Sequence, residues 1–148
     1  MKAEEMWKKF CIEKGISEDT PYEAWSFGGA PDKLAQLVLE GKKTATASAY
    51  DLYELDPGEK MPEKGDYSVI LNSRNEAVCM IQTVKTYVCP FMEINEEHAR
   101  KEGEGDLSLA YWRKVHEEFL TGEYERYGLT FDSNTAQILC EEFKLIKA

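Results

Sequence analysis

A glycine, two lysines and two threonines lie close together in the segment Glu40–Thr46. A helix is expected to end at Gly41 and a strand to begin at once, so a bend separates Lys43 from Thr46. In an ideal strand these two side chains would face opposite sides, and both reach one pocket only if the chain bends between them. Lys42 and Lys43 also suit a helix C-terminus, where cations complement the dipole. A P-loop is excluded, because its G-x-x-x-x-G-K-[ST] pattern follows a strand rather than a helix.

A second group of reactive side chains lies in the segment His98–Asp106, where glycines separate three carboxylates. Carboxylates this close repel one another, which raises their pKa values and suits a general acid or base. His98 and Glu102 are four residues apart on an expected helix, a spacing that also permits a metal pair. Asp106 is best explained as the N-cap of the next helix, whereas Glu102 and Glu104 have no comparable structural role.

The third group follows on the next helix, in the sequence Tyr111–His116. Trp112 lies on its apolar face and is expected in the core. Arg113 and Lys114 offer positive charge to a phosphate, although a solvated helix face is the more common role for such residues. His116 lies near the apolar stripe and is interpreted as a hydrogen-bonded packing histidine.

The elements that must position these groups follow from periodicity, caps and turn residues. Expected helices cover Glu4–Lys14, Pro31 to Gly41, about Ile94 to Glu102, and Asp106 to about Leu120, the last with Leu109, Val115 and Phe119 on its apolar face. Expected strands cover Thr44–Ser48, Tyr67–Asn72, Ala77–Val88 and Ala136–Ile146, and Pro21–Gly29 is expected to be an aromatic connection. Because strands and helices do not alternate regularly, the pattern favours an α+β fold with a small, largely antiparallel curved sheet over a doubly wound parallel sheet.

Length and charge narrow the class of protein further. The 148 residues fit one domain, and a mixture of 43% apolar and 31% charged residues is typical of a globular chain. A net charge of −10 argues against binding duplex DNA, which favours a basic face, but permits a nucleoside ligand.

The four cysteines fit no zinc pattern and are expected to be reduced thiols. Without a visible secretory signal or membrane span, the protein is expected in the cytoplasm.

The sequence resembles the longer bacterial branch of the ASCH family. Residues 41–46, Gly-Lys-Lys-Thr-Ala-Thr, fit the short family motif of a glycine, any residue, a lysine, two residues and a hydroxyl or acidic residue. Similarity extends from about Trp25 to the end and includes PEKGDYSVIL, FMEINEEHARKEGEGDLSLAYWRKVHEEF and CEEFKLI. The resemblance implies a single domain over residues 1–148, with residues 1–20 as a helical extension. It also implies a PUA-like fold, a small mixed, mostly antiparallel β-barrel with helices packed around it.

In one branch of that family the enzyme is an amidohydrolase that removes the acetyl group from N4-acetylcytidine. Its lysine, threonine and glutamate match Lys43, Thr46 and Glu102, which the resemblance therefore implies as catalytic residues. This chain departs from the compact amidohydrolases in its extra helix and its EGEGD loop, and some longer relatives resemble ribonucleases. Further residues are expected to contact the substrate, including aromatic side chains that stack on the base: Trp25, Gly41, Lys42, Ser48, Tyr50, Glu104 and Arg113.

Amide hydrolysis assigns a chemical role to each member of the trio. Thr46 would attack the acetyl carbonyl, while Lys43 would either accept its proton or, if charged, stabilise the oxyanion. Glu102 would protonate the leaving amine or activate the hydrolytic water. The alanine variants of all three are expected to lose turnover and keep the fold.

Two other functions remain open from the sequence. One is a single-strand ribonuclease, assisted by a divalent metal held by Glu102, Glu104 and Asp106. The other is a non-catalytic RNA-binding module, a common role of PUA-like domains. The net charge of −10 speaks against the binding module and somewhat against the ribonuclease. The expected partner is a nucleoside or single-stranded RNA, and neither duplex DNA nor a membrane is expected. The amidohydrolase is expected to need no cofactor, whereas the ribonuclease could use a divalent metal.

Overall fold

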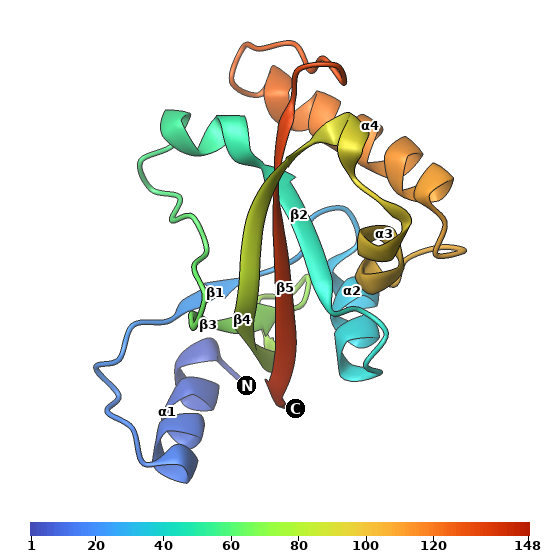
Figure 1. The fold of residues 1–148 in the computed structure, drawn as a ribbon. Coiled ribbons are helices and arrows are strands. Elements are labelled where there is room, and N and C mark those ends of the chain that lie inside the picture. Colours follow the sequence, from blue (N-terminus) through green and yellow to red (C-terminus); the bar gives the residue numbers. More distant parts are fainter.

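A curled five-stranded sheet forms the centre of the structure (Figure 1). The computed structural model describes residues 1–148. The strands, in their order across the sheet, are β1 (Glu23–Trp25), β3 (Tyr67–Leu71), β4 (Ala77–Pro90), β5 (Gln137–Lys147) and β2 (Ala45–Ala49). Only β1 and β3 pair in parallel, and all other pairs are antiparallel. The two edge strands, β1 and β2, do not pair with each other, so the curled sheet is a half-barrel and not a closed barrel. The predicted α+β class with a mostly antiparallel sheet is confirmed.

Four α-helices and two short 3-10 helices surround this sheet. They are α1 (Ala3–Lys14), α2 (Pro31–Leu39), η1 (Tyr50–Leu55), η2 (Phe91–Glu93), α3 (Glu96–Glu102) and α4 (Leu109–Glu125). Helix α1 packs on Val69 and Met80, whereas α2 packs on Ile70 and Cys79. Since neighbouring residues of a strand face opposite sides, α1 and α2 cover opposite faces of the β3–β4 pair.

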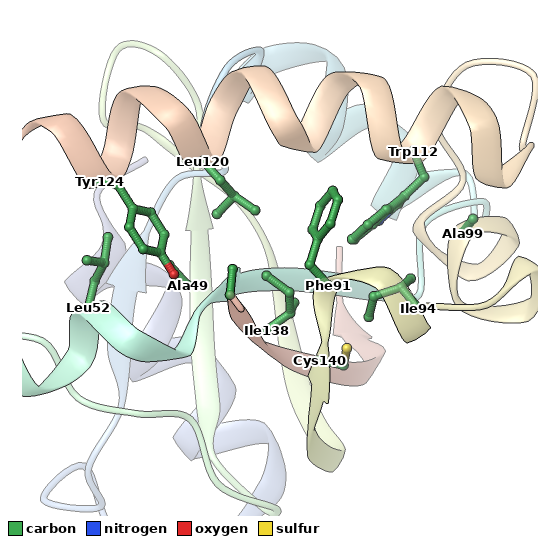
Figure 2. Packing of buried hydrophobic residues seen from close by; sticks show 11 residues of the cluster. Ala49, Leu52, Phe91, Ile94, Ala99, Trp112, Leu120, Tyr124, Ile138 and Cys140 are labelled. Carbon is green, nitrogen blue, oxygen red and sulfur yellow. The ribbon is translucent and has the colours of Figure 1, made fainter. Parts of the chain in front are cut away.

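Helix α4 lies across one end of the sheet and closes the third core cluster. Trp112, Leu120 and Tyr124 point from α4 toward the sheet and its connections (Figure 2). They pack with Ala49, Leu52, Phe91, Ile94, Ala99, Ala136, Ile138 and Cys140. Burying a large apolar side chain stabilises a fold by about 1.5–3 kcal/mol, so these three residues fix the position of α4 strongly.

The start and the apolar face of α4 differ from the sequence predictions. Ser108, not Asp106, is the N-cap, because its side chain accepts a hydrogen bond from the Tyr111 amide. The Asp106 carboxylate instead accepts the Ser108 amide, which shapes the turn before the helix. The helix continues five residues past Leu120, and Phe119, predicted on the apolar stripe, is 39% exposed.

The predicted aromatic connection contains a strand that the local pattern does not reveal. Residues Glu23–Trp25 form β1 by pairing with β3, a tertiary contact that a three-residue pattern cannot predict. Strand β4 also continues to Pro90, where proline is tolerated at the strand end. All four cysteines are free thiols. None of the helices has the length and apolar character needed to span a bilayer.

Candidate active site

The bend after α2 turns Lys43 toward the interior. Gly41 has φ +76°, and the amides of Lys42 and Lys43 both donate to the Leu37 carbonyl at 3.0 and 3.1 Å. This left-handed backbone conformation is favourable for glycine, because glycine has no Cβ that would clash. Strand β2 begins at Ala45, so Lys43 precedes the strand and is not bound by its two-residue alternation, and Lys43 and Thr46 both line one cavity, as the shared-pocket hypothesis requires. Lys43 is only 2% exposed.

The C-terminal end of α3 docks directly against this bend. The Thr44 amide donates to the Lys101 carbonyl at 2.7 Å. Gly103 has φ +72°, and a Cβ at this position would lie 2.1 Å from the carbonyl oxygen of Lys42. Only glycine permits so close an approach of the two backbones, and this contact brings the preceding residue, Glu102, next to Lys43.

The ammonium group of Lys43 is surrounded by acceptors. Its Nζ donates to Glu104 Oε2 and to the Ala45 carbonyl, both at 2.9 Å. Glu102 Oε1 and the Glu102 carbonyl oxygen lie farther away, both at 3.5 Å. The Phe27 ring adds a cation–π contact, with its centroid 5.1 Å from Nζ. The buried amino group is thus surrounded by acceptor atoms, two of which belong to carboxylates.

Glu102 is the acceptor at the centre of this network and is 1% exposed. Its Oε2 accepts hydrogen bonds from Trp112 Nε1 and from His98 Nε2, the latter at 2.7 Å. Its Oε1 faces Lys43 and His116 Nε2, at 3.5 and 3.4 Å. Burial alone would raise the pKa of Glu102, but the Lys43 charge and the bonds from His116 and His98 outweigh it and hold this pKa well below its usual range. Glu102 is therefore a carboxylate at neutral pH and has no proton to donate.

His116 connects this carboxylate to α4. Its Nδ1 lies 2.9 Å from the Trp112 carbonyl oxygen, which only accepts, so Nδ1 carries a proton. The imidazole stacks on the Trp112 ring, with centroids 4.1 Å apart. Burial lowers the pKa of His116, but the hydrogen bond and charge of Glu102 raise it more, so the net pKa is above its ordinary value. The ring is thus a potential proton carrier at the wall of the cavity.

Two adjoining cavities meet at Thr46. The smaller, of about 250 Å³, is lined by Lys43, Thr46, Glu102, Glu104 and His116, among others. The larger, of about 580 Å³, lies within the usual size range of ligand pockets, roughly 300–1,000 Å³. Residues that line both cavities are Phe27, Gly28, Thr46, Ala47 and Phe119. The two cavities therefore adjoin and together make up the cleft, and Thr46 belongs to the wall that they share.

The two cavities differ in charge. In the smaller one, Lys33 and Lys43 balance Glu102 and Glu104. The larger one contains five carboxylates but only two basic side chains, namely Glu23, Glu59, Asp66, Glu123 and Glu141 against Lys60 and Arg126. The larger cavity is consequently unfavourable for a phosphate and better suited to an uncharged or cationic ligand.

The structure brings together some of the residues predicted from the sequence. Lys43, Thr46, Glu102 and Glu104 line the smaller cavity, and Ser48 and Trp25 line the larger one. Ser48 is hydrogen-bonded to the hydroxyl of Tyr53 at 2.8 Å. In contrast, the Thr46 hydroxyl has no hydrogen-bond partner within the protein, and is free to meet a ligand.

Four residues predicted to contact the substrate lie outside both cavities. Gly41 forms the bend itself, and Tyr50 begins η1 beyond the end of β2. The Lys42 side chain is 66% exposed and pairs with Glu40 at 3.2 Å. Arg113 turns away from the cleft, and its Nη2 donates to the carbonyls of Met92 and Ile94.

The carboxylates proposed as metal ligands do not form a common donor set. Both oxygens of Glu102 face protein donors, Glu104 faces Lys43, and Asp106 is exposed and bonds to the Ser108 amide. No group of three or more His, Cys, Asp and Glu side chains is arranged to hold a metal ion. His98 and Glu102, the other suggested pair, are hydrogen-bonded to each other instead.

Two titratable residues of the cleft that matter for its chemistry, His116 and Glu141, are not among the predicted site residues. His116, interpreted as a packing residue, lines the smaller cavity, and its position four residues after Trp112 places both on one helix face. Glu141 lines the larger cavity. Its sequence signal is a carboxylate between Leu139 and Phe143 on one face of the final strand, where apolar side chains prevail.

Comparison with known proteins agrees with this fold. The structure is similar to a crystal structure of an ASCH domain from Lactobacillus crispatus, with a TM-score of 0.85, 26% identity and coverage of 98% of this chain and 94% of that chain. A crystal structure of a protein from Enterococcus faecalis also gives a TM-score of 0.85, with 30% identity and coverage of 97% and 92%. The ASCH protein of Zymomonas mobilis shares the fold alone, with a TM-score of 0.53, 12% identity and coverage of 84% and 70%.

The half-barrel and its surrounding helices thus define a PUA-like α+β fold. The family model described as ASCH domain matches residues 23–147, so the chain belongs to the ASCH domain family, which is linked to RNA-binding and hydrolase-like functions. No curated protein matches the sequence significantly.

Proposed function

We propose that this protein is an amidohydrolase that removes the acyl group from the exocyclic amine of an N4-acetylcytidine-like nucleoside. The observation that carries the proposal is that Thr46, whose hydroxyl has no partner in the protein, lines both the small cavity that contains Lys43 and the larger one of ligand size. An acyl group in the former and a nucleoside in the latter would place the scissile amide at Thr46.

The contacts of Lys43 favour one of its two suggested roles. A proton acceptor needs a free lone pair, but Lys43 Nζ directs its hydrogens at Glu104, Ala45 and Glu102. A buried ammonium instead supplies a preorganised positive charge for the oxyanion that forms when Thr46 attacks. The contact to Glu102 Oε1 is long, at 3.5 Å, so the developing oxyanion can replace it at low cost.

In this proposal Glu102 acts through its neighbours. Because its pKa is held low, it does not protonate the leaving amine, the role suggested by the sequence. Its carboxylate instead orients Lys43 and His116 at the wall of the smaller cavity. Glu102 is thus a positioning residue, whereas Thr46 and Lys43 contact the reacting group.

The surroundings of the cleft favour an uncharged nucleoside over RNA. Leu34, Val115 and Phe119 offer apolar surface to an acyl methyl group in the smaller cavity. Trp25 offers a ring for base stacking in the larger one. The five carboxylates of the larger cavity would repel a polyanion, in agreement with the net charge of −10.

The proposal is tested by incubating the protein with N4-acetylcytidine and, separately, with labelled single-stranded RNA, each with and without EDTA. We expect equal amounts of cytidine and acetate from wild-type protein, unaffected by the chelator, and loss of turnover in Thr46→Val. This variant keeps the β-branched shape of the strand residue and removes only the free hydroxyl. Strand scission sensitive to EDTA, or RNA binding without any product, would replace the amidohydrolase with the ribonuclease or the binding module.

A further inference from the structure

Glu141 of β5 is the cross-strand neighbour of Thr46. The β2–β5 register pairs these two residues directly, so their side chains lie on the same face of the sheet. The Cβ atoms of such a pair are about 4.5–5.5 Å apart, which brings the Glu141 carboxyl within reach of the Thr46 hydroxyl directly or through one water. Glu141 is 5% exposed and lines the larger cavity, in which Thr46 is also exposed.

The bonding of Glu141 leaves one side of its carboxyl free. Oε2 accepts a hydrogen bond from the Thr83 hydroxyl at 2.7 Å, whereas Oε1 has no hydrogen-bond partner in the protein. The register of β4 against β5 shifts between Thr83 and Lys85, an irregularity of the kind that re-aims side chains next to active sites. Unlike Glu102, Glu141 forms no ion pair, although burying a carboxylate without a counter-ion is costly. The presence of this carboxyl group beside Thr46, in spite of that cost, therefore indicates that Glu141 has a function in the cleft.

We propose that Glu141 is the general base and acid of the reaction, an inference that rests on the amidohydrolase function proposed above. In the first step the Glu141 carboxylate takes the proton of Thr46 Oγ1 as this oxygen bonds to the acyl carbon. The carbonyl π electrons move to the oxygen, which faces Lys43. When the C–N bond breaks, the proton passes from Glu141 to the leaving nitrogen, so that the free amine and an acyl-threonine remain.

Water completes the cycle through the same carboxyl group. Glu141 takes a proton from water as the hydroxyl oxygen bonds to the acyl carbon, and it returns this proton to Thr46 Oγ1 as the ester bond breaks. The sum is one amide and one water converted to one amine and one carboxylic acid. No metal, oxidant or other co-reactant enters the balance.

The environment tunes Glu141 for this role. Burial raises its pKa, the Thr83 hydrogen bond lowers it, the nearby Asp66 charge raises it and Lys43 lowers it, with a net pKa above the ordinary value. Burial raises the pKa of the nearby Tyr53 phenol, and the Glu141 charge in turn helps to raise it. The other charged side chains that line this cavity are Glu23, Glu59, Lys60, Glu123 and Arg126. A carboxyl whose pKa is raised toward neutrality is a more effective general base and acid at neutral pH.

The decisive variant is Glu141→Gln, studied with N4-acetylcytidine as substrate. Its amide oxygen still accepts the Thr83 hydrogen bond, but the side chain no longer exchanges protons. We expect kcat to fall by about 100-fold or more, the usual contribution of a general base, and the acidic limb of the pH profile to disappear. Thr83→Val removes a bond that lowers the pKa of Glu141, so its acidic limb is expected at higher pH than in the wild type.

Stability supplies a second readout that separates catalysis from structure. The pKa of Glu141 is raised in the folded state, so its contribution to stability is full below its unfolded pKa and is lost as the pH rises through the folded value. Glu141→Gln is therefore expected to match or exceed the wild-type melting temperature at neutral pH. The matched control is Glu142→Gln on the opposite face of β5, which should leave kcat unchanged.

Each outcome decides between the two proposals. An active wild type whose Glu141→Gln variant keeps its rate within a few-fold and its pH profile would overturn the role of Glu141 and leave the amidohydrolase intact. A Glu141→Gln variant that melts well below the wild type would assign the residue to structure and overturn the inference. A wild type without turnover would reject the amidohydrolase itself, and with it the role of Glu141.

Discussion

Replacing Lys43 with methionine should destabilise the fold as well as remove the oxyanion partner. The substitution keeps the length of the side chain but leaves Glu102, at 1% exposure, without its cation. Removing one partner of a buried ion pair costs about 3–5 kcal/mol. His98, Trp112 and His116 still donate to Glu102 in this variant, so we expect the lower end, about 3 kcal/mol. For a chain of this length each kcal/mol shifts the melting temperature by about 2–4 °C, which predicts a decrease of about 6–12 °C.

The pH dependence of this decrease identifies its cause. In the wild type the pKa of Glu102 is lower in the folded than in the unfolded state, so its stabilising contribution is present above the unfolded pKa and is lost as the pH falls through the folded pKa. Without Lys43 the burial effect gains weight and the pKa of Glu102 rises. The destabilisation caused by Lys43→Met should therefore be largest at neutral pH. The difference in melting temperature between this variant and the wild type should become smaller in acid.

Thermal unfolding followed by circular dichroism at several pH values measures both effects. The matched control is Lys42→Met, since the side chain of this neighbouring lysine is 66% exposed and its surface pair with Glu40 is screened by solvent and contributes little to stability. Equal melting temperatures for the two variants, or a gap independent of pH, would refute the buried network. The same measurement on the alanine variants of Lys43 and Glu102 tests the expectation from the sequence that they keep the fold.

Two further predictions concern the geometry around this network. Gly103→Ala should lower the free energy of unfolding, measured in urea, by more than Gly41→Ala does. Both residues have positive φ, which costs an alanine about 1–2 kcal/mol, but only at Gly103 would a Cβ also clash with the Lys42 carbonyl. Equal costs would contradict the close backbone contact. Glu102→Gln should lower the pKa of His116, because the carboxylate is what raises it, and NMR titration of the imidazole measures this. An unchanged His116 titration would show that the two groups do not interact.

The local part of the site could be predicted from the sequence. Gly41 ends the helix signal and Thr44 begins a two-residue alternation, which together predict the bend that separates Lys43 from Thr46. The spacing of His98 and Glu102 likewise predicts that they share a helix face, and the structure joins them by a hydrogen bond. Such features depend on residues a few positions apart, where helix and strand periodicity are informative.

Contacts between distant segments could not be predicted in this way. Glu141 faces Thr46 because of the register of β5 against β2, across 95 residues of sequence. Arg113 has the right chemistry for a ligand, but the packing of α4 directs it to the carbonyls of Met92 and Ile94. Lys42 and Lys43 are adjacent and identical in type, and the sequence around them does not show that the first is exposed and the second buried.

A crystal structure of the Thr46→Val variant with N4-acetylcytidine bound tests the central claim most directly. The proposal predicts the nucleoside in the larger cavity and the acetyl group in the smaller one, with the carbonyl carbon against the side chain at position 46 and the carbonyl oxygen directed at Lys43 Nζ. A nucleoside bound elsewhere on the surface, or one whose acetyl group points away from Lys43, would contradict it.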